Sequence, residues 1–339
     1  MVPRLSVVSM MADERQADIA WRRASIPAVE ATTARLRRIE LSPARFFQLT
    51  LVSLGALWLI VVTGAAVRVT DSGLGCRHWP GCEQGHPLPA KDYHAFIEFG
   101  NRALGGVVIV LVLLTAVSSF FVPGLSRGAR RLALAIFVGT LAQAPLGYLA
   151  VHSDLHWPVV AAHLLLSMAL LAGAVVLAFE ALALRSGRAE PVAPLELRRG
   201  ALAVAAAAGV LLLTGALATA GGPHSGGGAE HVDRLWRLQP LIYVHAATVG
   251  VFAVSLVFVL GYLASQRQRW PRLFGLGAAV FAVLLAQMAL GEVQYRTHLP
   301  WPLVLVHVGL AAAVWALLVA FVTVLWRPPA ALAARPHVD

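Results

Sequence analysis

The sequence predicts an all-α integral membrane protein with eight transmembrane helices, arranged as two tandem four-helix bundles that are parallel repeats of each other. Three observations predict this fold class. The 339-residue chain is 58% hydrophobic and only 13% charged, with a mean hydropathy of +0.73, whereas soluble domains carry about 25% charged residues. Its apolar residues fall into eight long runs, and the second half of the chain repeats the first at a spacing of 144 residues.

The eight apolar runs are each long enough to cross a bilayer as a helix. About 20 apolar residues span the hydrocarbon, where the backbone must satisfy its own hydrogen bonds. The runs are continuous, which excludes a β-barrel with alternating residues. A water-soluble globule, a disordered chain and a nucleic-acid-binding protein are excluded by composition. Spans are expected near residues 47–67, 95–121, 131–151, 158–183, 200–220, 240–263, 273–293 and 302–325.

The basic residues outside the spans predict the orientation. The two terminal segments and the connections near 122–131, 184–200 and 264–272 hold 20 Lys and Arg residues, against six in the other four connections. Basic connections stay in the cytoplasm, so both termini are predicted to be cytoplasmic. The first 45 residues also contain five acidic residues, which favours a bacterial tail over a mitochondrial presequence. The expected location is the bacterial inner membrane.

The internal repeat is clearest where residues 141–163 align without a gap on residues 285–307, with ten of 23 positions identical. Each repeat has an even number of helices, so the two lie in the same orientation in the membrane. The sequence therefore predicts a tail, an N-terminal bundle, a linker, a C-terminal bundle and a second tail, at residues 1–46, 47–183, 184–199, 200–325 and 326–339.

Three histidines, His163, His245 and His307, lie inside spans, roughly 8–10 Å below the outer surface. A single buried His is more often satisfied by a backbone carbonyl or a hydroxyl on a neighbouring helix. Two histidines at matching depth, on the sixth and eighth helices, favour metal binding over such a structural role. A pair of imidazoles from facing helices can bind a haem iron from both sides. We therefore expect His245 and His307 to be axial ligands.

The first repeat has Asn101 where the second has His245, and it adds two charged residues, Glu98 and Arg102. A Glu98–Arg102 pair at i and i+4 could serve only to neutralise both charges. Charged residues inside a membrane are nevertheless usually functional. The sequence thus indicates one bundle that holds a cofactor and one that handles something reactive.

The two cysteines, Cys76 and Cys82, lie in a predicted outer loop. A close pair in an oxidising compartment usually forms a disulfide. A zinc site with His78 and His86 is less favoured, because the spacing differs from that of zinc fingers. A catalytic thiol pair is a third interpretation. The Gly-rich run 221–228 lacks the Lys and helix of a phosphate-binding loop.

Several of these segments resemble the haem A synthase family (CtaA/Cox15-like proteins). They are TGAAVRVTDSGLGCRHWPGC (63–82), IEFGNR (97–102), the His-bearing segments WPVVAAH and WPLVLVH, and GPHSG (222–226). The resemblance extends over residues 47–325. It implies an eight-helix inner-membrane oxidoreductase that converts a ring methyl group of haem O to a formyl group by two successive oxidations. The product, haem A, then goes to terminal oxidases.

The resemblance also implies residue roles. His245 and His307 match the pair that holds the cofactor, haem b, which relays electrons. His163 matches one of two histidines of the N-terminal bundle, where the substrate haem binds. Glu98 matches the acidic residue implicated in the oxidation, where it would take up protons or stabilise a cation-like centre.

For the remaining candidates, the resemblance matches Cys76 and Cys82 to an outer-loop pair regarded as a disulfide, and we expect Asn101 and Arg102 to contact the substrate haem. Asn101 stands where the family commonly has His. The substrate iron is then left with one strong ligand, or Asn101 binds a propionate or an iron-bound water.

The expected partners are membrane lipid, haem O, a haem O synthase and oxidase assembly factors. An oligomer is compatible with the sequence, whereas a nucleic-acid partner is not.

There are three rival functions. A cytochrome b electron carrier would need His pairs near both faces, and a transporter would need polar sites near the midplane. A catalytically silent haem-binding paralogue could carry a change such as Asn101.

Overall fold

The computed structural model describes residues 40–76, 78, 79, 81–83, 88, 89, 92–227, 232 and 234–333. The predicted tails, His86 and part of the run 221–228 therefore lie wholly or partly outside the described residues. Within them, the chain forms eight long helices and two 3₁₀ turns: α2 (Pro43–Val69), α3 (Tyr93–Ser118), η1 (Ser119–Phe121), α4 (Arg127–His152), α5 (Trp157–Ser186), α6 (Leu195–Gly221), α7 (Leu238–Ser265), α8 (Pro271–Arg296), α9 (Trp301–Trp326) and η2 (Ala330–Leu332).

Capping residues and prolines mark the beginnings of these helices, close to the predicted ends of the spans. Ser42, Asp92 and Ser126 cap α2, α3 and α4, each accepting a hydrogen bond from a backbone N–H of the first turn. Such caps satisfy donors that have no partner within the helix. Proline stands in the first turn of α2, α5, α8 and α9, where its missing N–H costs nothing. All eight predicted spans are confirmed as helices.

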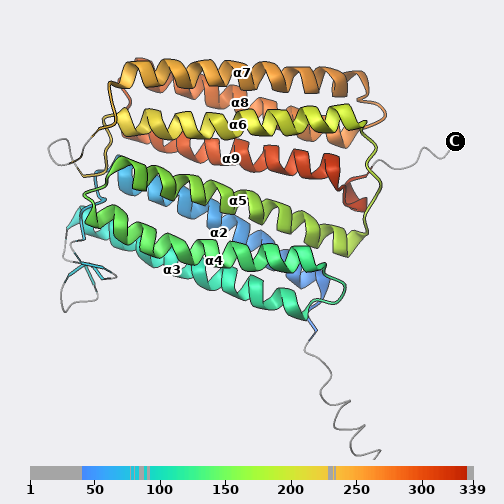
Figure 1. The fold of residues 1–339 in the computed structure, drawn as a ribbon, viewed down its shortest axis with the longest axis horizontal. Helices are drawn as coiled ribbons and strands as arrows, with labels where there is room; N and C mark the ends of the chain where they lie inside the picture. Colours follow the sequence, from blue (N-terminus) through green and yellow to red (C-terminus); the bar gives the residue numbers. More distant parts are fainter. Residues whose placement is uncertain are drawn as a thin grey trace, which may run out of the picture. The chain divides into compact units, whose positions relative to one another are not determined.

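The helices pack in two groups of four (Figure 1). In the first group α2 contacts α3 and α5, and α4 contacts the same two helices; in the second, α6 and α8 each contact α7 and α9. Helices α3 and α5 therefore lie diagonally across the first group, and α7 and α9 across the second. The groups meet where α9 contacts α2 and α5 and where α5 contacts α6.

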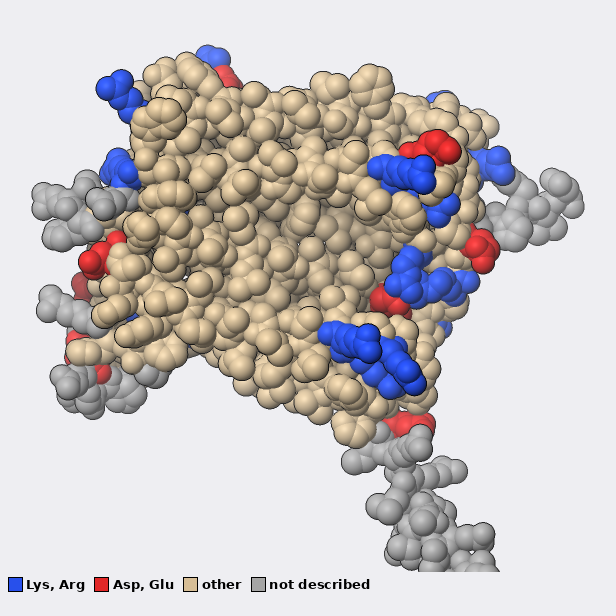
Figure 2. All heavy atoms as spheres, in the orientation of Figure 1, with Lys and Arg blue, Asp and Glu red and all other residues tan. Residues whose placement is uncertain are grey.

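Charged side chains gather near the two ends of the helices, and a broad band between them is almost free of charge (Figure 2). All eight helices are long and apolar enough to span a membrane. Many large apolar side chains on their surfaces are exposed, among them Val251, Val254 and Phe258 of α7. Since lipid is the solvent that such a band needs, the chain is a multi-pass membrane protein.

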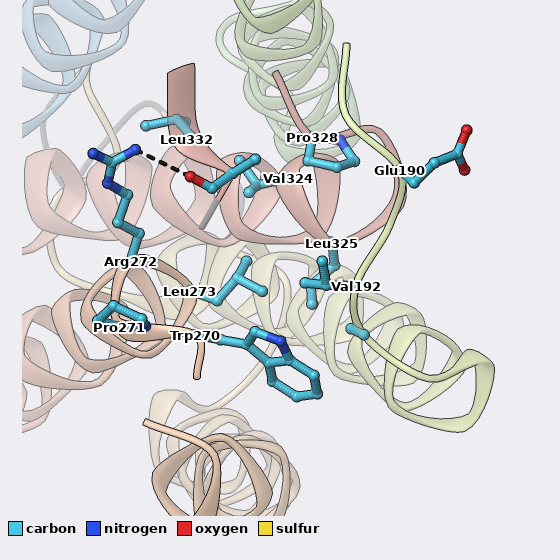
Figure 3. A pocket seen from close by; sticks show the side chains of 12 residues that line it. Glu190, Val192, Trp270, Pro271, Arg272, Leu273, Val324, Leu325, Pro328 and Leu332 are labelled. Carbon is cyan, nitrogen blue, oxygen red and sulfur yellow. Dashed lines mark hydrogen bonds between the residues drawn. The ribbon is translucent and has the colours of Figure 1, made fainter. Parts of the chain in front are cut away.

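The end of the helices farther from Cys76 is closed by the last described segment. Ala189, in the connection between α5 and α6, donates to the Pro328 carbonyl (3.0 Å), and Arg272 donates to the Ala333 carbonyl (3.2 Å). A small pocket lies between these segments (Figure 3). Nearby, the buried Glu180 pairs with Arg188 and Arg327. These contacts join both helix groups at this end.

Candidate functional site

His245 lies on α7, with its ring between α7 and α6. The Thr214 hydroxyl is 3.2 Å from its Nδ1 and also bonds Thr248. A Cβ at Gly215 would lie only 3.1 Å from the His245 Cε1, so the glycine makes room for the ring. The Thr214 contact fixes the ring orientation through Nδ1, as outer groups do for metal-bound histidines, and Nε2 makes no hydrogen bond to the described residues.

His307 lies on α9, diagonally opposite α7. Its Nδ1 is buried and has no hydrogen-bond partner among the described residues. A Cβ at Gly291 would lie 3.2 Å from its Cε1, and the Gln287 amide donates to its carbonyl (2.9 Å). Its Nε2 likewise makes no hydrogen bond to the described residues. An iron bound by Nε2 of His245 and of His307 fits this donor set, because imidazole nitrogens are axial ligands of haem.

His163 on α5 has surroundings similar to those of His307. Its Nδ1 is also buried without a hydrogen-bond partner in the described part of the chain. The Gln143 amide donates to the His163 carbonyl (3.2 Å) and to the Ser167 hydroxyl (2.7 Å). Gly147 faces the ring, since a Cβ there would lie 3.8 Å from Cε1. This imidazole also fits iron ligation.

Asn101 lies on α3, diagonally opposite α5. Its Oδ1 accepts a hydrogen bond from the Thr63 hydroxyl (2.8 Å). Thr63 begins a Thr-Gly-Ala triplet in α2, as Thr214 does in α6. A threonine therefore contacts Asn101 in one group of helices and His245 in the other, so the two side chains occupy comparable positions.

Glu98 and Arg102 form the predicted ion pair one turn apart on α3, and the loop before α3 covers it. Glu98 is only 4% exposed. Its Oε2 accepts from the Cys76 backbone N–H (2.7 Å). Arg102 donates to the carbonyls of His78 (2.6 Å) and Gly81 (2.7 Å) as well as to Glu98. The pair therefore binds the loop in addition to neutralising its own charges.

Cys76 and Cys82 form a disulfide within this loop. The structure thus bears out the first of the three interpretations of the pair, and no cysteine is free. No group of three or more His, Cys, Asp or Glu residues that could hold a metal ion occurs in the described ranges. The disulfide closes the loop that lies on Glu98.

Sequence reasoning missed several of these contacts. Gln143 and Gln287 were inside the repeated segment, in an identical Leu-Ala-Gln triplet, and that identity was a usable signal. No pattern in the sequence distinguishes Arg68 from the other basic residues, but it donates to the carbonyls of Thr219 (2.9 Å) and His224 (3.0 Å). The segment around GPHSG therefore joins the two groups of helices, a contact that no local pattern predicts.

The family model that describes cytochrome oxidase assembly proteins, COX15-CtaA, matches residues 47–223. This range includes Glu98, Asn101, Arg102, His163 and the disulfide loop, and ends after the first helix of the second group. The chain belongs to this family. The membership agrees with the resemblance seen in the sequence and indicates haem-related chemistry for this chain.

Individual members of the family and a related enzyme are similar to the chain. A haem A synthase of Symbiobacterium thermophilum is 30% identical over 290 residues, which cover 79% of this chain and 92% of the relative. A protohaem IX farnesyltransferase of Thermus thermophilus is 32% identical over 295 residues, 79% of this chain. This chain spans 46% of the Thermus protein and 31% of a haem A synthase of Geobacillus thermodenitrificans, to which it is 35% identical over 98 residues.

Proposed function

We propose that this protein is a haem A synthase, an oxidoreductase that converts a methyl group of haem O to a formyl group. One observation carries the proposal beyond family membership: comparable positions of two helix groups hold buried imidazoles, and only the first group adds Glu98 and Arg102. One group is then suited to a permanent cofactor and the other to a substrate that reacts.

We also propose that the two groups are tandem parallel repeats with both termini in the cytoplasm. Support comes from details 144 residues apart. The Gln143–His163 and Gln287–His307 hydrogen bonds match, and so do the pairs of positive φ angles at Asp154–Leu155 and His298–Leu299. The disulfide loop then faces outward, in an oxidising compartment.

The second group of helices would hold haem b between His245 and His307. When bound, haem b supplies a one-electron relay. The protein residues do the positioning: Thr214 fixes the His245 ring through Nδ1 (3.2 Å), and Gly215 and Gly291 let both rings lie close to their neighbouring helices.

The first group would hold haem O between α3 and α5, with its iron on His163. Asn101 would leave the opposite face of the iron open to a weaker ligand, and Arg102 would lie near the haem propionates at the outer edge. Converting the methyl group to a formyl group is a four-electron oxidation, for which an external oxidant would take up the electrons; two successive hydroxylations would give an alcohol and then a gem-diol, which loses water to form the aldehyde. Glu98, fixed by the Cys76 N–H, would take up protons or stabilise positive charge at the reacting carbon.

The reaction needs a supply of haem O, and a haem O synthase is the proposed source. The similarity to a Thermus farnesyltransferase that is much longer than this chain supports a close relation between the two activities. Oxidase assembly factors are the proposed recipients of haem A.

The test is to express the chain with a haem O supplier, extract its non-covalent haem and identify each species by mass. We expect haem B together with haem A or its alcohol precursor. Haem B alone would contradict the synthase activity and leave an electron carrier or an inactive paralogue. The absence of all haem would contradict the ligand roles of His163, His245 and His307 together.

A further inference from the structure

Arg68, in the last turn of α2, carries a charge that no acidic group among the described residues neutralises. It forms no ion pair in this part of the chain. Asp71, the nearest acidic residue along the chain, instead accepts a hydrogen bond from the Gly226 N–H (3.2 Å) through its Oδ1. A charged group in a membrane-spanning helix is costly without a counter-charge and usually serves a ligand or a substrate path.

Two backbone carbonyls of the second group of helices hold the Arg68 guanidinium in place. Its Nη2 donates to the Thr219 carbonyl (2.9 Å) and its Nε donates to the His224 carbonyl (3.0 Å), whereas Nη1 makes no hydrogen bond to the described residues. The chain at Gly226 packs on the Arg68 side chain, since a Cβ there would lie 3.6 Å from the Arg68 Cγ. Arg68 is thus fixed in position, and one amino group of its planar fork is left to bind another acceptor.

The guanidinium lies one helical turn from the proposed haem b site, toward the disulfide end of the helices. Thr219 follows Gly215 by four residues on α6, so the two lie on the same face, about 6 Å apart along the axis. Gly215 is the residue that makes room for the His245 ring. The carbonyl that Arg68 contacts is therefore directly beyond that ring.

Within the described residues, the second group has no partly buried arginine of its own at this end. Counted from the shared Thr-Gly-Ala triplets, the position equivalent to Arg68 is Thr219, and the position 144 residues after Arg102 is Ala246. The arginines described in its connections at this end are all exposed, namely Arg234, Arg237 and Arg296. Arg68 therefore brings from the first group a cation that the second group lacks.

The propionates of a haem held by His245 and His307 would face the disulfide end. In the other direction the second group is filled by apolar side chains, and Leu256, Leu318 and Phe321 are each 0% exposed. Ionised carboxylates are unstable in such packing. The acidic edge of the haem is consequently directed toward the level of Arg68.

We propose that Arg68 binds a propionate of haem b, so that the first group of helices supplies a ligand to the cofactor of the second. The inference rests on the haem b site of the proposed function. A charge-assisted hydrogen bond from a fixed guanidinium anchors the carboxylate. The same positive charge stabilises ferrous over ferric haem, because the ferrous form carries one positive charge less.

The test is Arg68→Gln in a His163→Ala background, in which the substrate site does not compete for haem. Protein from haem-deprived cells is titrated with protohaem IX and with its dimethyl ester, which has no propionate charge. We expect the Kd for protohaem IX to rise about tenfold to a hundredfold, as for the loss of a hydrogen bond to a charged group. The Kd for the dimethyl ester should stay unchanged. The matched control is Arg296→Gln, which removes an exposed arginine at the same end and should alter neither Kd.

The reduction potential of the bound haem is a second readout. Arg68→Gln should lower it, because the cation that favours the ferrous form is gone. Arg296→Gln should leave it unchanged. A wild-type potential in Arg68→Gln would overturn the proposal.

An unchanged Kd for protohaem IX would also overturn the proposal. So would an equal rise in Kd for protohaem IX and its dimethyl ester, which would show that Arg68 acts only by joining the two groups of helices. If Arg68→Gln binds neither compound, Arg68→Lys decides by the same comparison, because lysine keeps the charge but lacks the planar fork.

Failure of the proposed function gives different results. Wild-type protein that holds no low-spin haem b would contradict the haem b site, and with it the role of Arg68. Wild-type protein that holds haem b and oxidises haem O, with an Arg68→Gln variant that binds protohaem IX equally well, would overturn the role of Arg68 alone.

Discussion

The helices α2–α5 and α6–α9 share a plan and differ where the chemistry is proposed. In both, a glutamine amide bonds the carbonyl of a buried histidine and a threonine contacts the side chain across the bundle. Only the first has Glu98 and Arg102, covered by a disulfide loop, and only the first pairs its histidine with Asn101. Under the proposed function, the shared residues would position a haem, while the residues that differ would decide whether it is kept or changed.

The largest expected effect concerns Glu98. Glu98→Gln keeps the size of the side chain but removes its charge and its ability to take up a proton. Haem A formation should fall by about a hundredfold to ten-thousandfold, with haem O binding retained, as measured by extracted haem and by titration. The matched control is Glu292→Gln, which alters the exposed i, i+4 pair with Arg296. Unchanged haem A output in Glu98→Gln would show that the carboxylate is not catalytic.

A smaller effect is expected at the threonine that both groups of helices place against the side chain across the bundle. Thr214→Val removes the hydroxyl at His245 Nδ1 and keeps the shape. Loss of such an outer contact typically lowers metal affinity by about tenfold to a hundredfold, so haem b should dissociate faster into an apo-globin acceptor. Thr323→Val, on α9 where the hydroxyl bonds only the Val319 carbonyl, is the control. Equal dissociation from both variants would contradict the role of Thr214.

Asn101→His would make the first group resemble the second. With Thr63 in place to bond the new ring, the substrate haem should become bis-imidazole, low-spin and more tightly held, with slower release of haem A. Electron paramagnetic resonance of the haem O complex measures the spin state. Asn101→Ala is the control, and it should stay five-coordinate. A spectrum unchanged by Asn101→His would show that residue 101 does not face the iron.

The smallest effect concerns the contact between the groups. Trp58 of α2 donates to the Gly309 carbonyl of α9 (3.2 Å), two residues after His307. Trp58→Phe keeps most of the ring but removes this donor. Hydrogen bonds between membrane helices contribute about 0.6 kcal/mol on average, so the free energy of unfolding in detergent should fall by about that amount. Trp79→Phe, in the outer loop, is the comparison. A loss of several kcal/mol would indicate that Trp58 does more than join the helices.

The helices and the buried histidines could be predicted because lipid imposes strict rules on both. A span must be long and apolar, and a polar residue within it is costly, so it usually has a function. The covering of Glu98 by the Cys76 N–H and the contacts of Arg68 with Thr219 and His224 could not be predicted. They join loops to distant helices, and neither hydrophobic periodicity nor residue spacing encodes such contacts.

The most direct test of the difference between the two groups is low-temperature electron paramagnetic resonance of protein made without a haem O supplier. The wild-type chain should show one low-spin bis-imidazole haem b. His245→Ala and His307→Ala should each abolish this signal, whereas His163→Ala should leave it intact. Loss of the signal in His163→Ala with retention in His307→Ala would contradict the assignment of cofactor and substrate to their respective groups of helices.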